Sequence, residues 1–77
     1  MSLEEYEQLL VRQNGACAIC GKQTTMRLCV DHCHATGRVR GLLCSKCNLG
    51  IGQLDDDPGL MQAAIAYLSR RQEDEPP

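Results

Sequence analysis

The chain lacks the large aromatic side chains that usually dominate a small core. Its 77 residues include no Trp, no Phe and two Tyr. Ordering a chain costs about 1.5 kcal/mol per residue in conformational entropy, and short chains seldom recover this cost from apolar burial alone. Because few aromatic side chains are available for burial, the composition predicts a single small domain that needs a cross-link, either disulfides or a bound metal ion, as a staple.

Long apolar runs are missing as well. No stretch approaches the roughly 20 apolar residues of a membrane span, and the chain opens on a charged, helix-like run rather than a signal segment. We therefore expect a cytoplasmic protein without membrane contact.

Six cysteines are the available staple. Fully oxidised, they would form three disulfides, as in small secreted domains. Four of them instead form two Cys-x-x-Cys pairs, Cys17/Cys20 and Cys44/Cys47. This grouping favours a closed, structural Zn²⁺ site, whose binding energy of about 10–16 kcal/mol can replace a missing core. We expect Cys29 and Cys33 to pack as small half-buried side chains.

Charge is distributed unevenly along the chain. Residues 16–53 carry five basic side chains against one acid, whereas residues 1–15 sum to −2 and residues 54–77 to −4. A basic middle favours a polyanionic partner. On charge alone, an ordinary solvated face explains the same pattern equally well.

The local signals predict a small α+β fold. Ser2 and Glu5 match a capping box that opens a helix, and Asn14-Gly15 is a typical helix stop. Residues 28–30 and 39–43 predict two strands of a β-hairpin. The segment 31–34 would then lie exposed at the tip of this hairpin.

Two further helices are expected after the hairpin. Ser45 would cap a short helix that ends at Gly50 or Gly52, and Asp57 with Pro58 would begin another that ends near residues 70–71. The apolar face of the last helix consists of Leu60, Met61, Ala64, Tyr67 and Leu68. Residues 1–71 would form one domain, and the acidic segment 72–77 a disordered tail.

Both histidines of the chain, His32 and His34, follow Asp31 within the hairpin segment. Two imidazoles and a carboxylate would suit a second zinc ion. Alternatively, Asp31 and the side-chain oxygen of Asn48 would suit Mg²⁺, which prefers few oxygen ligands and leaves room for phosphate. The residues leave both interpretations open.

The motifs together resemble the recombination endonuclease VII family, a group of phage-type nucleases in the HNH, or ββα-metal (His-Me finger), superfamily. The resemblance extends from about residue 15 to residue 68. It rests on Cys17-x-x-Cys20-Gly21 and on Val30-Asp31-His32-Cys33-His34-x-Thr36-Gly37-x-Val39-Arg40-Gly41-Leu42-Leu43-Cys44-x-x-Cys47-Asn48-x-Gly50-Ile51-Gly52.

The resemblance implies a zinc-stapled ββα-metal core with an N-terminal and a C-terminal helix. It also implies a DNA endonuclease of low sequence specificity. Asp31 and Asn48 would hold a catalytic Mg²⁺ or Mn²⁺, His32 would be the general base, and His34 would have a supporting role. Arg38, Arg40 and Lys46 would be candidates for contacts with DNA phosphates.

The length departs from the family pattern. The long dimerising helices and further C-terminal domain of a branched-DNA resolvase do not fit in this chain, so a monomer or a partner-dependent module is expected. An alternative of another class is a non-catalytic zinc-ribbon-like module that binds DNA or protein. Such a module has no need to keep Asp31, His32 and Asn48 together.

Overall fold

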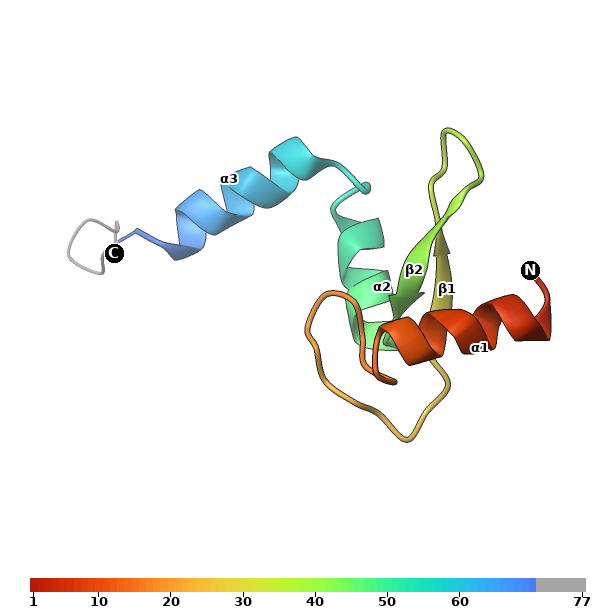
Figure 1. Ribbon diagram of the computed structural model, residues 1–77. Helices are drawn as coiled ribbons and strands as arrows, with labels where there is room; N and C mark the ends of the chain where they lie inside the picture. The colour runs from red at the N-terminus through yellow and green to blue at the C-terminus, as the bar shows by residue number, and fades with distance from the viewer. Residues whose placement is uncertain (71–77) are drawn as a thin grey trace.

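The computed structural model describes residues 1–70 and confirms a small α+β fold (Figure 1). The elements in chain order are α1 (Leu3–Arg12), β1 (Cys29–His32), β2 (Val39–Leu43), α2 (Ser45–Gln53) and α3 (Pro58–Leu68). The predicted tail 72–77 lies outside the described residues.

The first helix begins and ends as the sequence predicts. Ser2 N donates to Glu5 Oε1 over 3.0 Å, and Glu5 N donates to Ser2 Oγ over 3.1 Å, which completes the capping box. Beyond the helix, Asn14 and Gly15 adopt φ values of 55° and 69°. Gly15 N donates to Leu10 O, so the left-handed turn satisfies a carbonyl of the last helical turn.

Two side chains tie α1 to the rest of the molecule. The buried Tyr6 hydroxyl donates to Leu28 O over 2.8 Å. Gln13 Nε2 donates to Leu42 O over 2.9 Å, and Leu42 N donates to Gln13 Oε1 over 3.0 Å. A Cβ at Gly41 would lie 3.2 Å from Gln13 Oε1, so a glycine here permits the close approach.

The antiparallel hairpin differs from the expectation on its first strand. The strand over 39–43 is confirmed, but β1 runs from Cys29 to His32 rather than over 28–30. Asp31 is therefore paired with Gly41 inside the sheet and is only 9% exposed. The expectation of an exposed tip was wrong for Asp31, because the ladder continues past the apolar residues, with a register shift between Asp31 and His32.

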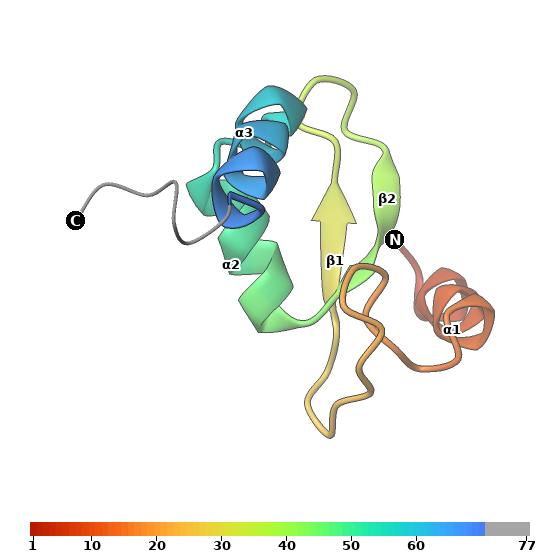
Figure 2. The same cartoon turned by 90° about the vertical axis from the view of Figure 1, so that its left-hand side faces the viewer.

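The hairpin lies between α1, on the β2 side, and α2, on the β1 side (Figure 2). Among residues 1–70, five buried side chains form the core of this arrangement: Tyr6, Cys17, Leu28, Leu42 and Leu43. So small a core agrees with the need for a staple that the composition predicts.

The second helix differs from its prediction at both ends. Its N-cap is Cys44, whose sulfur accepts from Cys47 N over 3.4 Å, and not Ser45. The helix passes Gly50 and Gly52 and ends at Gln53. A sulfur acceptor at the cap explains the early start, since it satisfies a backbone donor of the first turn.

The third helix begins with Asp57 as N-cap and Pro58 in the first turn, as predicted. It ends at Leu68, slightly before the predicted end near residues 70–71. Its apolar face does not enter the core: Leu60, Tyr67 and Leu68 are exposed, and the helix projects away from the hairpin (Figure 1). Within residues 1–70, no helix has the length and apolar character needed to cross a membrane.

Candidate functional site

The two Cys-x-x-Cys pairs converge on one point. The sulfur atoms of Cys17, Cys20, Cys44 and Cys47 all lie within 4.8 Å of one another. The Cys20 and Cys44 sulfurs are 4.0 Å apart, close to the roughly 3.8 Å edge of a tetrahedron with Zn–S bonds of 2.3 Å. The prediction of a four-cysteine group that can bind zinc is confirmed.

Local backbone geometry presents each pair. Gly21 has a φ of 72° and its N–H donates to Cys17 O over 3.0 Å, which closes the turn that carries the first pair. The second pair occupies the N-cap and first turn of α2. Backbone N–H groups point at two sulfurs, with Ile19 N donating to Cys17 and Cys47 N to Cys44, both over 3.4 Å.

The pKa values of two thiols in the cluster, Cys17 and Cys47, are shifted in opposite directions. Burial raises the pKa of Cys17, but backbone N–H groups, those of Cys20 and Cys44 first, outweigh it and lower this pKa to about 6. The hydrogen bond with the Cys44 thiol raises the pKa of Cys47 to about 12. Four thiolates at these distances need a cation, and Zn²⁺ would supply it.

Two lysines lie next to the cysteine cluster. Lys22 and Lys46 line a hollow together with Cys20, Cys44 and Cys47. A zinc ion with four thiolates carries a net charge of −2, so two nearby ammonium groups suit it. Lys46 is a predicted phosphate contact, but balancing the charge of a bound zinc ion would explain its position equally well.

Asp31 is held by Arg40 from the neighbouring strand. Arg40 Nε donates to Asp31 Oδ2 over 2.6 Å, and Arg40 Nη2 donates to Asp31 Oδ1 over 2.9 Å. This two-pronged bond to the carboxylate raises the pKa of Arg40 above its ordinary value. Arg40, also a predicted phosphate contact, thus lies against the predicted metal ligand.

A second carboxylate joins this pair from the turn between α2 and α3. Asp56 Oδ2 lies 3.2 Å from Arg40 Nη2 and 3.2 Å from His34 Nε2. Sequence reasoning assigned Asp56 only to a turn. The run Asp55-Asp56-Asp57 marks a negatively charged turn, but no local sequence pattern relates this turn to a hairpin some 20 positions earlier.

The other predicted site residues lie on the hairpin and on α2. His32 is the last residue of β1 and is exposed, and Arg38 is exposed in the hairpin loop. Asn48 is half-buried on α2, which packs against both strands. Cys29 and Cys33 are half-buried and outside the zinc cluster, as expected.

The second-zinc interpretation gains no support. Among residues 1–70, the cysteine cluster is the group of three or more His, Cys, Asp or Glu side chains whose ligand atoms converge. His34 instead contacts Asp56.

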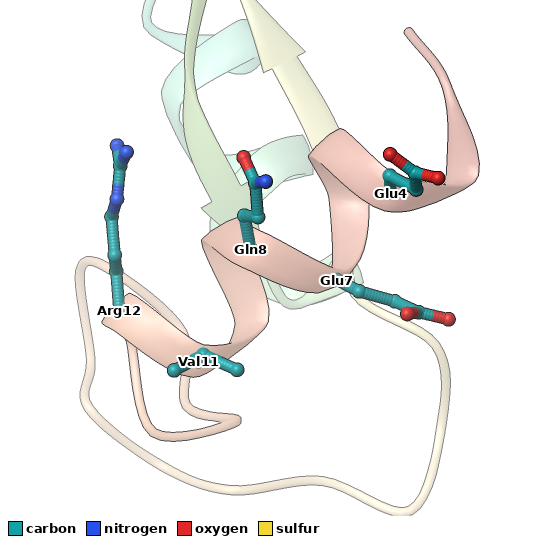
Figure 3. A pocket seen from close by; sticks show the side chains of 5 residues that line it. All are labelled: Glu4, Glu7, Gln8, Val11 and Arg12. Atoms are coloured by element: carbon teal, nitrogen blue, oxygen red, sulfur yellow. The ribbon is translucent and has the colours of Figure 1, made fainter.

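A separate hollow lies on the outer face of α1 (Figure 3). It is lined by Glu4, Glu7, Gln8, Val11 and Arg12. Its two carboxylates would repel a phosphate, and it holds neither histidine nor cysteine. The candidate chemistry is therefore at the hairpin.

Fold and site define a class of small α+β proteins in which clustered cysteines support a hairpin that carries a buried carboxylate and a histidine. The family model for recombination endonuclease VII matches residues 1–70, and the chain belongs to this family. No solved structure matches the chain.

Two phage proteins are similar to the chain. One is the Gene 59 protein of Mycobacterium phage D29, 44% identical over 73 residues, which cover 91% of this chain and 44% of the relative. The other is the Gene 59 protein of Mycobacterium phage L5, 44% identical over 68 residues, covering 84% and 42%. The chain thus spans less than half the length of these relatives.

Proposed function

We propose that the chain is an HNH-type, Mg²⁺- or Mn²⁺-dependent endonuclease that hydrolyses DNA phosphodiester bonds. The observation that carries this proposal is a ββα arrangement in which the hairpin that bears Asp31 and His32 packs against the helix that bears Asn48 (Figure 2). The chain with this arrangement belongs to an endonuclease family.

The donor set fits a hard divalent ion. Asp31 and Asn48 offer a carboxylate and an amide oxygen, the ligands that Mg²⁺ and Mn²⁺ prefer. Each Asp31 oxygen accepts one Arg40 donor and keeps a further lone pair for a cation. When bound, the ion would polarise the scissile phosphate and offset the negative charge of the leaving oxygen.

His32 is the proposed general base. Imidazole is the side chain best suited to take a proton from water near neutral pH. Its exposure at the end of β1 leaves it open to water and DNA. His34 would support the site through its contact with Asp56.

DNA would be bound mainly through its backbone. Arg38 is exposed in the hairpin loop and is the strongest of the three candidates for a phosphate contact, because Arg40 pairs with Asp31 and Lys46 lies beside the cysteines. Phosphate contacts give low sequence specificity and binding that weakens with salt.

One observation favours the non-catalytic alternative. The Asp31 carboxylate is already satisfied by Arg40, as it would be in a purely structural ion pair. A zinc-stabilised module that binds DNA or protein would be compatible with that pairing.

Supercoiled plasmid separates the two candidates. The purified zinc-loaded protein is expected to nick it with added Mg²⁺ or Mn²⁺ and to leave it intact in their absence. Four-way-junction, linear and single-stranded DNA would define the preferred substrate. Intact plasmid across a series of divalent ions, with DNA still bound, would favour the binding module.

A further inference from the structure

We propose that Asp56, from the turn between α2 and α3, is a positioning residue of the hairpin site. By sharing the Arg40 guanidinium with Asp31, it sets how strongly Arg40 occupies that carboxylate, and so how well Asp31 binds a divalent cation. This inference rests on the proposed function for the role of Asp31.

The contacts form a chain of alternating charge. Arg40 Nη2 lies between two carboxylates, 2.9 Å from Asp31 Oδ1 and 3.2 Å from Asp56 Oδ2. Asp31 is buried and the Asp56 side chain is only 18% exposed, so solvent screens neither carboxylate fully. Without Asp56, Arg40 would neutralise Asp31 alone, and a cation would have to compete with an undivided positive charge.

The backbone turn that presents Asp56 is itself costly. Asp55 and Asp56 have φ values of 58° and 52°, a left-handed region that glycine occupies more readily. Asp56 N donates to Ile51 O over 2.9 Å, and Asp55 N to Gly52 O over 3.0 Å. The turn therefore caps α2 firmly and fixes the position of the Asp56 carboxylate beside the hairpin.

Charge and geometry act in the same direction for Asp56. Its negative charge attracts a cation near Asp31, and its contact draws Arg40 away from Asp31. Removing Asp56 should therefore weaken cation binding. Residues that orient a metal ligand typically contribute 10- to 100-fold to metal affinity, and Asp56 acts one contact further away.

The test is a titration of the zinc-loaded full chain with Mn²⁺ alone, followed by electron paramagnetic resonance of the free ion. Asp56→Asn is expected to raise the Kd for Mn²⁺ about tenfold. The matched control is Asp55→Asn, which removes the same charge one residue away and should change the Kd less than about twofold. Asp31→Asn should abolish the binding, which locates the ion.

A double-mutant cycle then shows whether Asp56 acts through Arg40. In an Arg40→Gln background, Asp56→Asn should change the Kd clearly less than it does in the wild type, because only the direct attraction between the Asp56 charge and the cation remains. Arg40→Met, which also removes the charge but keeps an apolar stem of similar length, serves as the background should the glutamine variant unfold. Zinc content and circular dichroism verify that each variant is folded.

Four results would overturn the inference: no Mn²⁺ binding by the wild type, binding that survives Asp31→Asn, equal effects of Asp55→Asn and Asp56→Asn, or an undiminished Asp56→Asn effect without Arg40. Plasmid cleavage by the same samples is a separate readout. If Mn²⁺ binding behaves as expected while DNA stays uncut, the proposed nuclease function fails and the positioning role of Asp56 stands.

Discussion

The molecule contains two clusters of four side chains, and the two clusters differ in how their charges are balanced. In the zinc cluster, Cys17, Cys20, Cys44 and Cys47 carry charges of one sign, so the group needs an external cation. In the hairpin cluster, Asp31, Arg40 and Asp56 alternate in sign, and His34 contacts Asp56, so the charges of the cluster balance one another. The first is suited to stabilising a fold, and the second to chemistry on a fold that already exists.

Removing zinc should have the largest effect on stability, because the four thiolates repel one another without a cation. Zinc sites of this kind contribute about 10–16 kcal/mol, which matches or exceeds the stability of most small domains. Chelation, or Cys44→Ser, is therefore expected to abolish the helical circular dichroism signal and the bound zinc.

Cys29→Ser is the control for that experiment, since Cys29 is half-buried and outside the cluster. It should retain zinc and helix content. A native circular dichroism spectrum after complete zinc removal would contradict the claim that the cysteine cluster stabilises the fold.

Leu42→Ala tests the packing that both clusters share, because β2 carries Leu42 between Arg40 and Cys44. Leu42 is fully buried, and the truncation should lower the free energy of unfolding by about 2–5 kcal/mol in urea titrations of the zinc-loaded protein. Leu68→Ala, at a side chain 78% exposed on α3, should cost less than about 0.5 kcal/mol. Equal losses would mean that α3 is packed in solution.

The smallest effect is expected at the start of α1, far from both clusters. Ser2→Ala removes one half of the capping box and should cost about 1 kcal/mol, measured by chemical denaturation at pH 7. Gln8→Ala, on the exposed part of the same helix, is the control. An unchanged stability of Ser2→Ala would show that the box does not persist in solution.

The pH dependence of this effect has a defined sign. Hydrogen bonds from the Ser2 backbone and side chain hold the pKa of Glu5 below its ordinary value of 4.5. A carboxylate with a lowered folded pKa stabilises the protein above its unfolded pKa, and this contribution is lost as the pH falls through the folded value. The contribution of Glu5 should therefore be complete at pH 7.

The zinc cluster and the N-terminal caps of α1 and α3 could be predicted because their signals are local. Paired cysteines two residues apart, Ser2 with Glu5, and Asp57 with Pro58 each specify their geometry within a few positions. The start of the last helix at Pro58 could be predicted in the same way. Its exposure could not, because periodicity shows which residues share a face and not whether another element covers that face.

The hairpin cluster could be predicted only in part, since its contacts depend on tertiary structure. The burial of Asp31 depends on Arg40 across the sheet, a partner that the apolar strand signal does not reveal. Asp56 reaches the site only because α2 extends to Gln53 and stops in a left-handed turn. The sequence predicted a helix end at Gly50 or Gly52, which would leave that carboxylate without a defined position.

The most direct test of a hairpin built for hydrolysis is the single-turnover cleavage rate of His32→Ala on supercoiled plasmid, at zinc content and circular dichroism equal to the wild type. Loss of a general base should slow Mg²⁺-dependent nicking by about 100-fold or more. A His32→Ala rate within a few fold of the wild type would contradict the assignment of the chemistry to this hairpin.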